Sequence, residues 1–191
     1  MAQMAKLCVD KSPTLLPSGL DREQPAVPRW YAVQAHVRSE LQAVSQLTSK
    51  GVEAFLPSYQ EVRKWSDRTK LFIKPLIPGY VFVRVILSGQ IKLRTLETFG
   101  VHSFVAFAGV SPFIPDEQML YLKQLSENNI RASAFPGTLQ TGQRVRIRNG
   151  CLAGIEGMLV VTPESKVITI FIESIHQSIR IAADDLDFGP L

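Results

Sequence analysis

The chain has few residues that could bind a metal ion or form a disulfide. Its 191 residues include two cysteines and three histidines. Cys8 and Cys151 lie far apart, and neither has a partner at the spacing of a zinc site. No Ser, Cys or Asp motif places a nucleophile beside His36, His102 or His176, and no phosphate-binding Gly-Lys-Ser/Thr loop is present. We therefore expect free thiols, no metal, no cofactor and no enzymatic activity.

Long hydrophobic runs are absent as well. No apolar run approaches the roughly 20 residues that a membrane-spanning helix needs, and the first residues lack the continuous apolar core of a signal peptide. The chain is 46% hydrophobic and 20% charged, which is enough apolar material for one or two domains with real cores. We expect a soluble, cytoplasmic and monomeric protein that has no membrane partner.

Positive charge is concentrated in the middle of the chain. Residues 29–131 contain thirteen Lys and Arg against eight Asp and Glu, a net charge of +5, whereas residues 132–191 have a net charge of −1. Such asymmetry favours a polyanionic partner for the middle region. An ordinary solvated basic surface explains the same charge equally well, so both interpretations stay open at this point.

Hydrophobic periodicity divides the chain into a tail, a mixed domain, a connector and a small barrel. Residues 1–28 carry four prolines and few apolar side chains, so we expect a flexible tail. Strands and helices alternate in residues 29–127, which predicts an α+β domain with an antiparallel sheet flanked by helices. The expected strands are 30–36, 52–56, 80–85 and 104–107, with a basic hairpin at 59–65 and 70–73. The expected helices are 39–50, 91–98 and 115–127.

Two of these helices carry recognisable signals. Ser39 and Gln42 have the spacing of a capping box, and Pro115 suits the first turn of a helix. Apolar residues then recur at helical spacing, which predicts a buried stripe on each helix. The stripes consist of Leu41, Val44 and Leu47 in the first helix and Met119, Leu120, Leu122 and Leu125 in the second.

The C-terminal residues read as a small all-β barrel. In QRVRIRNGCLAGIEGMLVV, residues 143–161, two alternating runs flank a turn that contains Gly150, Gly154 and Gly157. Glycines at this spacing mark tight turns and close backbone approach, and further short strands are expected at 167–172 and 178–181. The sequence predicts a linker at 128–138 and a barrel at 139–191.

Together these motifs resemble the NusG family of transcription elongation factors. The C-terminal tail is similar to the SH3-like KOW barrel, and five blocks before it follow the order of this family: WYAVQAH, KGVEAFLP, PLIPGYVFVRV, IKLRTLETFGVHSFVAF and IPDEQM. The resemblance covers Trp30 to the C-terminus and implies an NGN domain at 29–127. The KWSDR hairpin looks like that of specialised paralogs, the RfaH and UpxY type, which act on selected operons.

The resemblance implies that RNA polymerase is the partner. An apolar groove of the NGN domain would bind the clamp helices of the polymerase, so that the factor bridges the clamp and suppresses pausing and termination. The groove positions are Ile77, Pro78, Tyr80, Phe82, Met119 and Leu122, with Ile77 in place of the usual Phe. Lys92, Leu93, Arg94 and Thr95 fall in the region that contacts the polymerase gate loop in RfaH-like proteins, without the His-Thr-Thr pattern. Plain core packing is the alternative explanation of the groove residues.

A second set of residues has the composition of a nucleic-acid surface. Single-stranded DNA is bound by cationic grooves with aromatic side chains for stacking, and the hairpin interleaves basic residues with a tryptophan. The set, which the resemblance places near the non-template DNA strand, is His36, Arg38, Arg63, Lys64, Trp65, Arg68 and Lys70. A solvated hairpin would have the same composition.

The barrel contains a loop that binds a second partner in the general family member. That partner is termination factor Rho or a small-subunit ribosomal protein, and the loop normally carries an apolar pair. Here Ile175 is followed by His176, so half of the pair is kept. Two other functions therefore stay open beside specialised antitermination: a general factor that couples the polymerase to Rho or the ribosome, and a ribosome-associated RNA-binding KOW protein.

Overall fold

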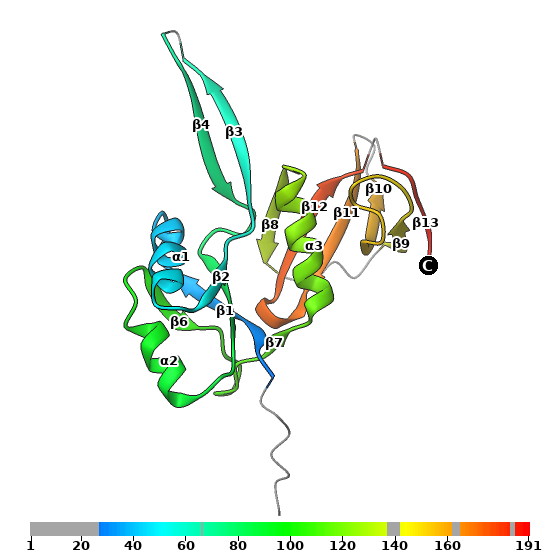
Figure 1. Ribbon diagram of the computed structural model, residues 1–191. Coiled ribbons are helices and arrows are strands. Elements are labelled where there is room, and N and C mark those ends of the chain that lie inside the picture. Colours follow the sequence, from blue (N-terminus) through cyan, green and yellow to red (C-terminus); the bar gives the residue numbers. More distant parts are fainter. Residues whose placement is uncertain (1–26, 66, 137–141, 162–164, 184–185) are drawn as a thin grey trace, which may run out of the picture.

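The N-terminal half of the structure is an antiparallel sheet with helices on both faces (Figure 1). The computed structural model describes residues 27–65, 67–136, 142–161, 165–183 and 186–191. The sheet order is β2-β5-β1-β6, with β7 also paired to β1. The strands are β1 (Arg29–Ala35), β2 (Glu53–Phe55), β5 (Tyr80–Val85), β6 (Val101–Phe104) and β7 (Phe113–Ile114); the helices are α1 (Glu40–Ser49), α2 (Gly89–Leu96) and α3 (Asp116–Glu127). The expected α+β class is confirmed. Almost all of the expected tail, residues 1–28, lies outside the described residues.

Strand β1 is buried on both faces because it lies inside the sheet. Val33 and Ala35 pack with Leu47 and other residues of the α1 side, as the alternation predicts. Trp30 and Ala32 point to the opposite face, where they join a second cluster that includes residues of α3. A half-buried strand would have left this second face in water. Its burial implies that α3 and the elements packed beyond it complete the core.

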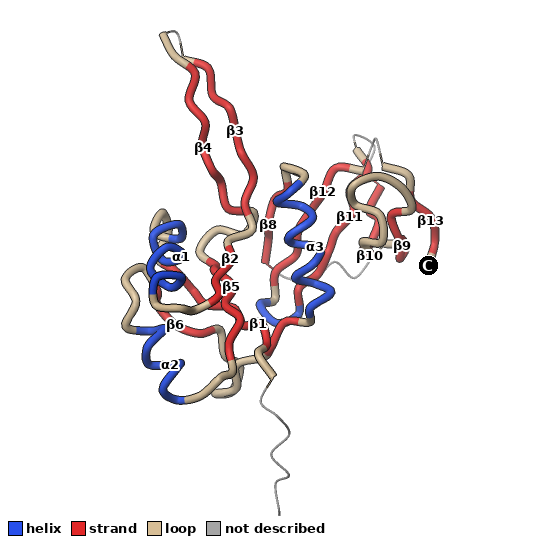
Figure 2. Tube along the Cα trace, viewed as in Figure 1, coloured by secondary structure: helices blue, strands red, loops and turns tan. Residues whose placement is uncertain are grey.

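The C-terminal half is a six-stranded antiparallel sheet in the order β13-β9-β10-β11-β12-β8 (Figure 2). It confirms the expected all-β region. Its strands are β8 (Ala132–Pro136), β9 (Gln143–Ile147), β10 (Glu156–Val161), β11 (Lys166–Ile172), β12 (Gln177–Ala182) and β13 (Phe188–Pro190), with the short 3-10 helix η1 (Glu173–Ile175) before β12. Strand β8 lies within residues 128–138, where the sequence suggests a linker, and it pairs with β12. The connector is thus partly a strand of the barrel.

The glycine-rich turn of the barrel has a steric explanation. Gly150 and Gly154 adopt φ of +86° and +90°, which side chains with a Cβ rarely tolerate. At Gly157 a Cβ would lie 2.8 Å from the carbonyl oxygen of Thr169, because β10 and β11 approach closely there. The three predicted turn positions therefore have two different roles, backbone conformation and strand contact.

Several local expectations were wrong. The Ser39 side chain makes no capping hydrogen bond, and Leu41 and Leu120 are exposed whereas Glu40 and Tyr121 are buried. The strand expected at 104–107 is β6, which ends at Phe104. Glu40 is buried because its carboxylate accepts the N–H of Gly79 at 3.0 Å, a contact with a distant segment that helical periodicity does not encode. In the described part of the chain, no helix has the length and apolar character needed to cross a membrane.

Candidate functional site

The turn that precedes β5 is fixed from two sides. Gly79 has φ of +79°, and its carbonyl oxygen accepts the N–H of Ala35 at 2.9 Å. Its own N–H donates to the Glu40 carboxylate, so β1 and α1 both hold the turn. Hydrogen bonds to a carboxylate are stronger than those between neutral groups. This turn orients the flanking side chains: Pro78 is exposed and Tyr80 is half-buried.

The predicted groove is covered in this structure. Phe82, Met119 and Leu122 are 0%, 1% and 1% exposed, and Ile77 is also buried. They belong to one contiguous cluster that continues into barrel residues such as Leu152 and Ile155. Figure 1 shows α3 between the N-terminal sheet and the barrel. Five of the six predicted groove residues are thus brought together, whereas Pro78 is exposed and lines a separate groove beside the start of α1. A partner could reach the buried members only after the barrel moves.

Tyr121 carries a polar contact between α3 and the barrel. Its hydroxyl donates to the Glu117 carboxylate at 2.6 Å and lies 3.5 Å from the carbonyl oxygen of Gly154 in the glycine-rich turn. Burial, followed by the hydrogen bond to Glu117, raises the pKa of Tyr121 to about 12. The phenol therefore stays protonated through the physiological range and keeps its donor at the interface.

The predicted partner loop of the barrel lies at the same interface. Ile175 is buried, and the Ser174 hydroxyl donates to the carbonyl oxygen of Phe113 at 3.0 Å. The centres of the His176 and Phe107 rings are 4.5 Å apart. The backbone of His176 adopts φ of +50°. The loop expected to recruit a second protein is thus engaged with the N-terminal domain. Ile175 is therefore covered together with most of the candidate polymerase groove, whereas His176 remains exposed beside Phe107.

The hairpin β3–β4 (Ser58–Lys64 and Thr69–Pro75) projects from the body of the molecule (Figure 1). Its base is braced by α3, because the N–H groups of Ser58 and Gln60 donate to the side chains of Ser126 and Asn129. A two-stranded hairpin is marginally stable on its own. These contacts explain how it keeps its position away from the core.

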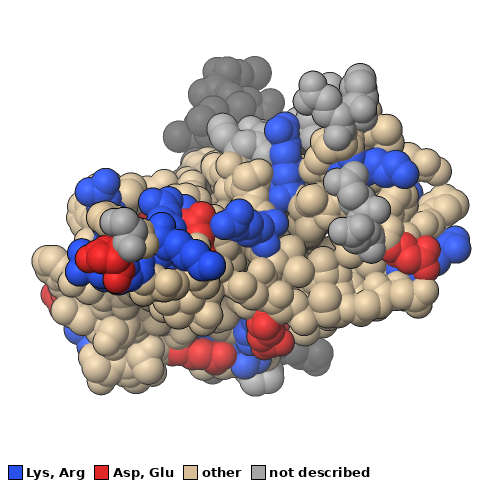
Figure 3. All heavy atoms as spheres, turned by 90° about the horizontal axis from the view of Figure 1, so that it is seen from above, with Lys and Arg blue, Asp and Glu red and all other residues tan. Residues whose placement is uncertain are grey.

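Positive charge gathers around the end of this hairpin, as the view from above shows (Figure 3). The Glu61 carboxylate accepts from Lys74, Arg63 and Arg131 at 2.5, 3.0 and 3.1 Å. These partners, the hydrogen bond from Lys74 above all, lower the pKa of Glu61.

Other cations of the hairpin remain available to a ligand. The Arg68 guanidinium lies 5.8 Å from the centre of the Trp65 ring. Lys64 and Lys70 form no salt bridge with any residue that the structure describes. The end of the hairpin therefore combines free cations with one exposed aromatic ring.

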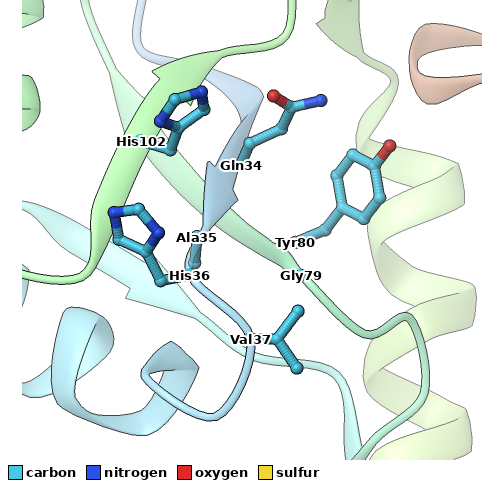
Figure 4. A pocket seen from close by; sticks show the side chains of 7 residues that line it. All are labelled: Gln34, Ala35, His36, Val37, Gly79, Tyr80 and His102. Atoms are coloured by element: carbon cyan, nitrogen blue, oxygen red, sulfur yellow. The ribbon is translucent and has the colours of Figure 1, made fainter.

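His36 lies in a different place from the hairpin cations. It lines a cavity of about 300 Å³ with Gln34, Tyr80 and His102, and the two histidine rings are 5.6 Å apart (Figure 4). His102 and Gln34 were not predicted from the sequence. No local pattern indicates them, because Gln34 and His102 are brought together by the register of β1 with β6, which shifts between Gln34 and Ala35. Arg38 has φ of +73° and lies beside the base of the hairpin instead.

The region expected to contact the gate loop forms part of α2. Thr95 is buried and its hydroxyl donates to the carbonyl oxygen of Ile91, so it has a structural role. Lys92 is half-buried near the Phe104 ring, whereas Leu93 and Arg94 are exposed. Two of the four predicted positions are therefore freely accessible.

Neither a metal centre nor a disulfide emerges from the residues that the structure describes. Within them, no group of three or more His, Cys, Asp or Glu side chains is placed to hold a metal ion. Cys151 is exposed and unpaired, and Cys8 lies outside the described residues. The candidate surfaces on the described residues are a covered apolar groove, a cationic hairpin and a loop.

Comparison with known proteins points to one family. A family model described as "Transcription termination factor nusG" matches residues 28–123, just over half of the chain. Proteins named "Transcription termination/antitermination protein NusG" from Staphylococcus aureus strains Mu50 and N315 are 28% identical over 149 residues, covering 71% of this chain and 80% of theirs.

Solved structures show weaker similarity. The structure entitled "Domain interaction in Thermotoga maritima NusG" has a TM-score of 0.48 and 20% identity, and the match covers 84% of this chain and 96% of that one. A structure of the MjSpt4:Spt5 complex has a TM-score of 0.30 and 14% identity, with 84% and 98% of the two chains covered.

Proposed function

The chain belongs to the NusG family of transcription termination and antitermination factors, and from this we propose that it acts as a specialised member. It binds RNA polymerase across the clamp and suppresses pausing and termination on selected operons. The observation that carries the proposal is the braced, projecting hairpin with free cations and an exposed tryptophan. Such a device suits contact with the exposed non-template strand, because cations neutralise phosphates and an aromatic ring stacks on bases.

Polymerase binding uses the apolar groove, and the barrel competes for it. The groove residues and the barrel core form one buried cluster, so the same surface cannot hold the barrel and the clamp helices at once. The apparent affinity for polymerase is then reduced by the fraction of molecules that are closed. Opening also exposes the buried Ile175 and frees the His176 ring from its contact with Phe107, so that both can meet a second partner.

Affinity for purified core RNA polymerase tests this proposal. The double variant Phe107→Ala with Ser174→Ala removes the ring contact with His176 and the hydrogen bond to Phe113 without changing a fully buried apolar side chain. We expect it to bind core polymerase several-fold more tightly than the wild type, because the open fraction rises. Tyr80→Ala, in the predicted groove, should weaken binding in both backgrounds.

The control is Val161→Glu, an exposed position of the barrel that lies away from the interface contacts described above. It should leave polymerase binding unchanged. If neither the wild type nor the opened variant binds core polymerase, the proposed function is wrong.

The alternative is that the chain acts as a general factor of this family and not as a specialised one. The relatives carry the name of the termination and antitermination protein, which favours a factor that also couples polymerase to Rho or the ribosome. The barrel loop would carry this contact, and in the closed structure Ile175 is 3% exposed. Binding of purified Rho or of a small-subunit ribosomal protein by the opened variant would favour the general function. Retention of RNA without polymerase would favour a ribosome-associated protein.

A further inference from the structure

The β3–β4 hairpin has two chemically different faces. Residues that pair across antiparallel strands point to the same side, and neighbours along a strand point to opposite sides. The pairs Val62 with Leu71 and Gln60 with Ile73 therefore share one face. The pairs Arg63 with Lys70 and Glu61 with Phe72 share the other, which continues to Trp65 and Arg68. The first face carries the aliphatic side chains, and the second carries most of the cations and the aromatic rings.

The aliphatic face is exposed along its length. Val62, Leu71 and Ile73 are 58%, 57% and 48% exposed. At the base of the hairpin the face continues into a groove of about 400 Å³ beside the start of α1, where Val37 and Leu41 are 71% and 51% exposed. Leu56, Pro75 and Pro78 complete the lining. Contiguous exposed apolar surface of this kind marks interaction sites in proteins.

Charge around this surface is positive. Arg38 lines the groove, and Lys64 lies at the far end of the same face of the hairpin. Glu40 is the only acid among the described residues that line the groove, and it is buried with its carboxylate on the N–H of Gly79. A ligand at this surface therefore meets aliphatic side chains bordered by two cations.

We propose that this surface, formed by Val37, Leu41, Val62, Leu71 and Ile73, is a second contact with RNA polymerase. Its occupant is a protein segment that presents aliphatic side chains bordered by Asp or Glu. Aliphatic side chains do not stack on bases, so this face suits protein, whereas the opposite face of the hairpin suits nucleic acid. The hairpin then lies between DNA and polymerase protein. The inference rests on the proposed function for the identity of the partner.

Charge disfavours the other occupants. In a symmetric dimer the same patch meets itself, so the Arg38 and Lys64 cations of two copies would be brought together without an acid to pair with. Residues 1–26 of this chain contain three basic and three acidic residues, so they offer no net negative charge to this surface. An acidic aliphatic segment of another protein satisfies both features of the surface.

Site-specific photocrosslinking in the full chain tests the two faces directly. The photoreactive residue p-benzoyl-phenylalanine is placed at Leu71 or at Lys70, adjacent positions that point to opposite sides. Each variant is bound to an elongation complex assembled from purified core RNA polymerase, RNA and a DNA bubble, and is then irradiated. We expect the probe at 71 to crosslink to a polymerase polypeptide and the probe at 70 to crosslink to DNA.

Affinity measurements with charge variants test the chemistry of the occupant. Leu71→Glu should weaken binding to the elongation complex roughly tenfold, and Leu71→Lys should weaken it clearly less. Leu71 is exposed and outside the core, so neither variant should affect folding, which circular dichroism checks. Val161→Glu in the barrel is the matched control, because it is exposed to a similar degree.

Each failure has a distinct meaning. If the wild type binds and Leu71→Glu binds equally well, or the probe at 71 reaches DNA, a second copy or residues 1–26, the inference is overturned and the proposed function stands. Equal losses for the Glu and Lys variants would overturn the acidic character of the occupant. If the wild type does not bind polymerase at all, the proposed function fails and the inference fails with it.

Discussion

The covered groove and the projecting hairpin differ in how far they expose the residues that we propose to bind a partner. The groove residues Phe82 and Met119 are fully buried because the barrel completes their core, whereas Leu71 and Trp65 on the hairpin remain in water. Buried apolar surface stabilises the fold, at about 25 cal/mol per Å², and exposed apolar surface does not. A surface that also forms part of the core must therefore be uncovered before a partner can bind it. A surface outside the core can remain exposed to solvent.

The largest expected effect is the loss of stability caused by a substitution in the groove. Phe82→Ala should lower the free energy of unfolding by about 3–5 kcal/mol, because it leaves a cavity in the cluster shared by both domains. Leu71→Ala in the hairpin should change it by less than about 0.5 kcal/mol. Urea denaturation of both variants measures the difference. Similar losses would mean that the hairpin is part of the cooperative core.

The turn before β5 gives the next largest effect. Glu40→Ala removes a hydrogen bond between a carboxylate and the N–H of Gly79, so we expect a loss of about 1.5–3 kcal/mol in the free energy of unfolding. Thermal or urea denaturation gives the value. The exposed helix neighbour Leu41→Ala is the matched control and should have little effect, although helical periodicity would assign it the core position.

Substitutions of the hairpin cations should change the salt dependence of DNA binding more than they change the stability of the fold. Replacing Arg68 and Lys70 by Ala should make the slope of log affinity for single-stranded DNA against log salt shallower by roughly 1.4, since each phosphate contact contributes about 0.7. Arg63→Ala should change it less, because Arg63 is already paired with Glu61. Filter binding at several salt concentrations provides the slopes. A slope that none of these variants alters would assign the hairpin cations to solvent.

The smallest expected effect concerns pH at the interface. The pKa of Tyr121 is raised to about 12 in the folded protein, against 10.0 for an unperturbed tyrosine. The folded state therefore holds this proton more tightly, and its contribution is fully present below pH 10 and is lost as pH rises toward 12. Stability measured from pH 9 to pH 12 should fall less steeply in Tyr121→Phe. Parallel curves for the two proteins would contradict the assignment.

Local patterns predicted much of this molecule, and long-range contacts explain most of the rest. Strand β5 was predicted with its observed bounds because its apolar run and the preceding Pro-Gly turn are local signals. Leu41 was wrongly assigned to the buried stripe, and the burial of Glu40 was not predicted, because the partner of Glu40, the N–H of Gly79, is distant in sequence. Five of the six predicted groove residues lie in or against one cluster, and Pro78 does not. Their covering by the barrel depends on how two domains meet, and no periodicity encodes that.

Edge strands and the histidine pair were missed for related reasons. Strands β8 and β13 are short, end in proline and pair at the edges of their sheet, so they lack the pattern of a central strand. His36 and His102 come from separate segments, and only the register of β1 with β6 places them together.

The pairing of β8 with β12 limits how the barrel can leave the groove. Only residues 128–131 separate the end of α3 from β8. While β8 remains paired with β12, this linker lets the barrel move no more than roughly 15 Å from the end of α3. A short linker of this kind gives the barrel an effective concentration in the millimolar range at the groove. If a helical partner binds the groove as proposed, it displaces a barrel that stays tethered beside it. The barrel can then cover the groove again as soon as the partner leaves.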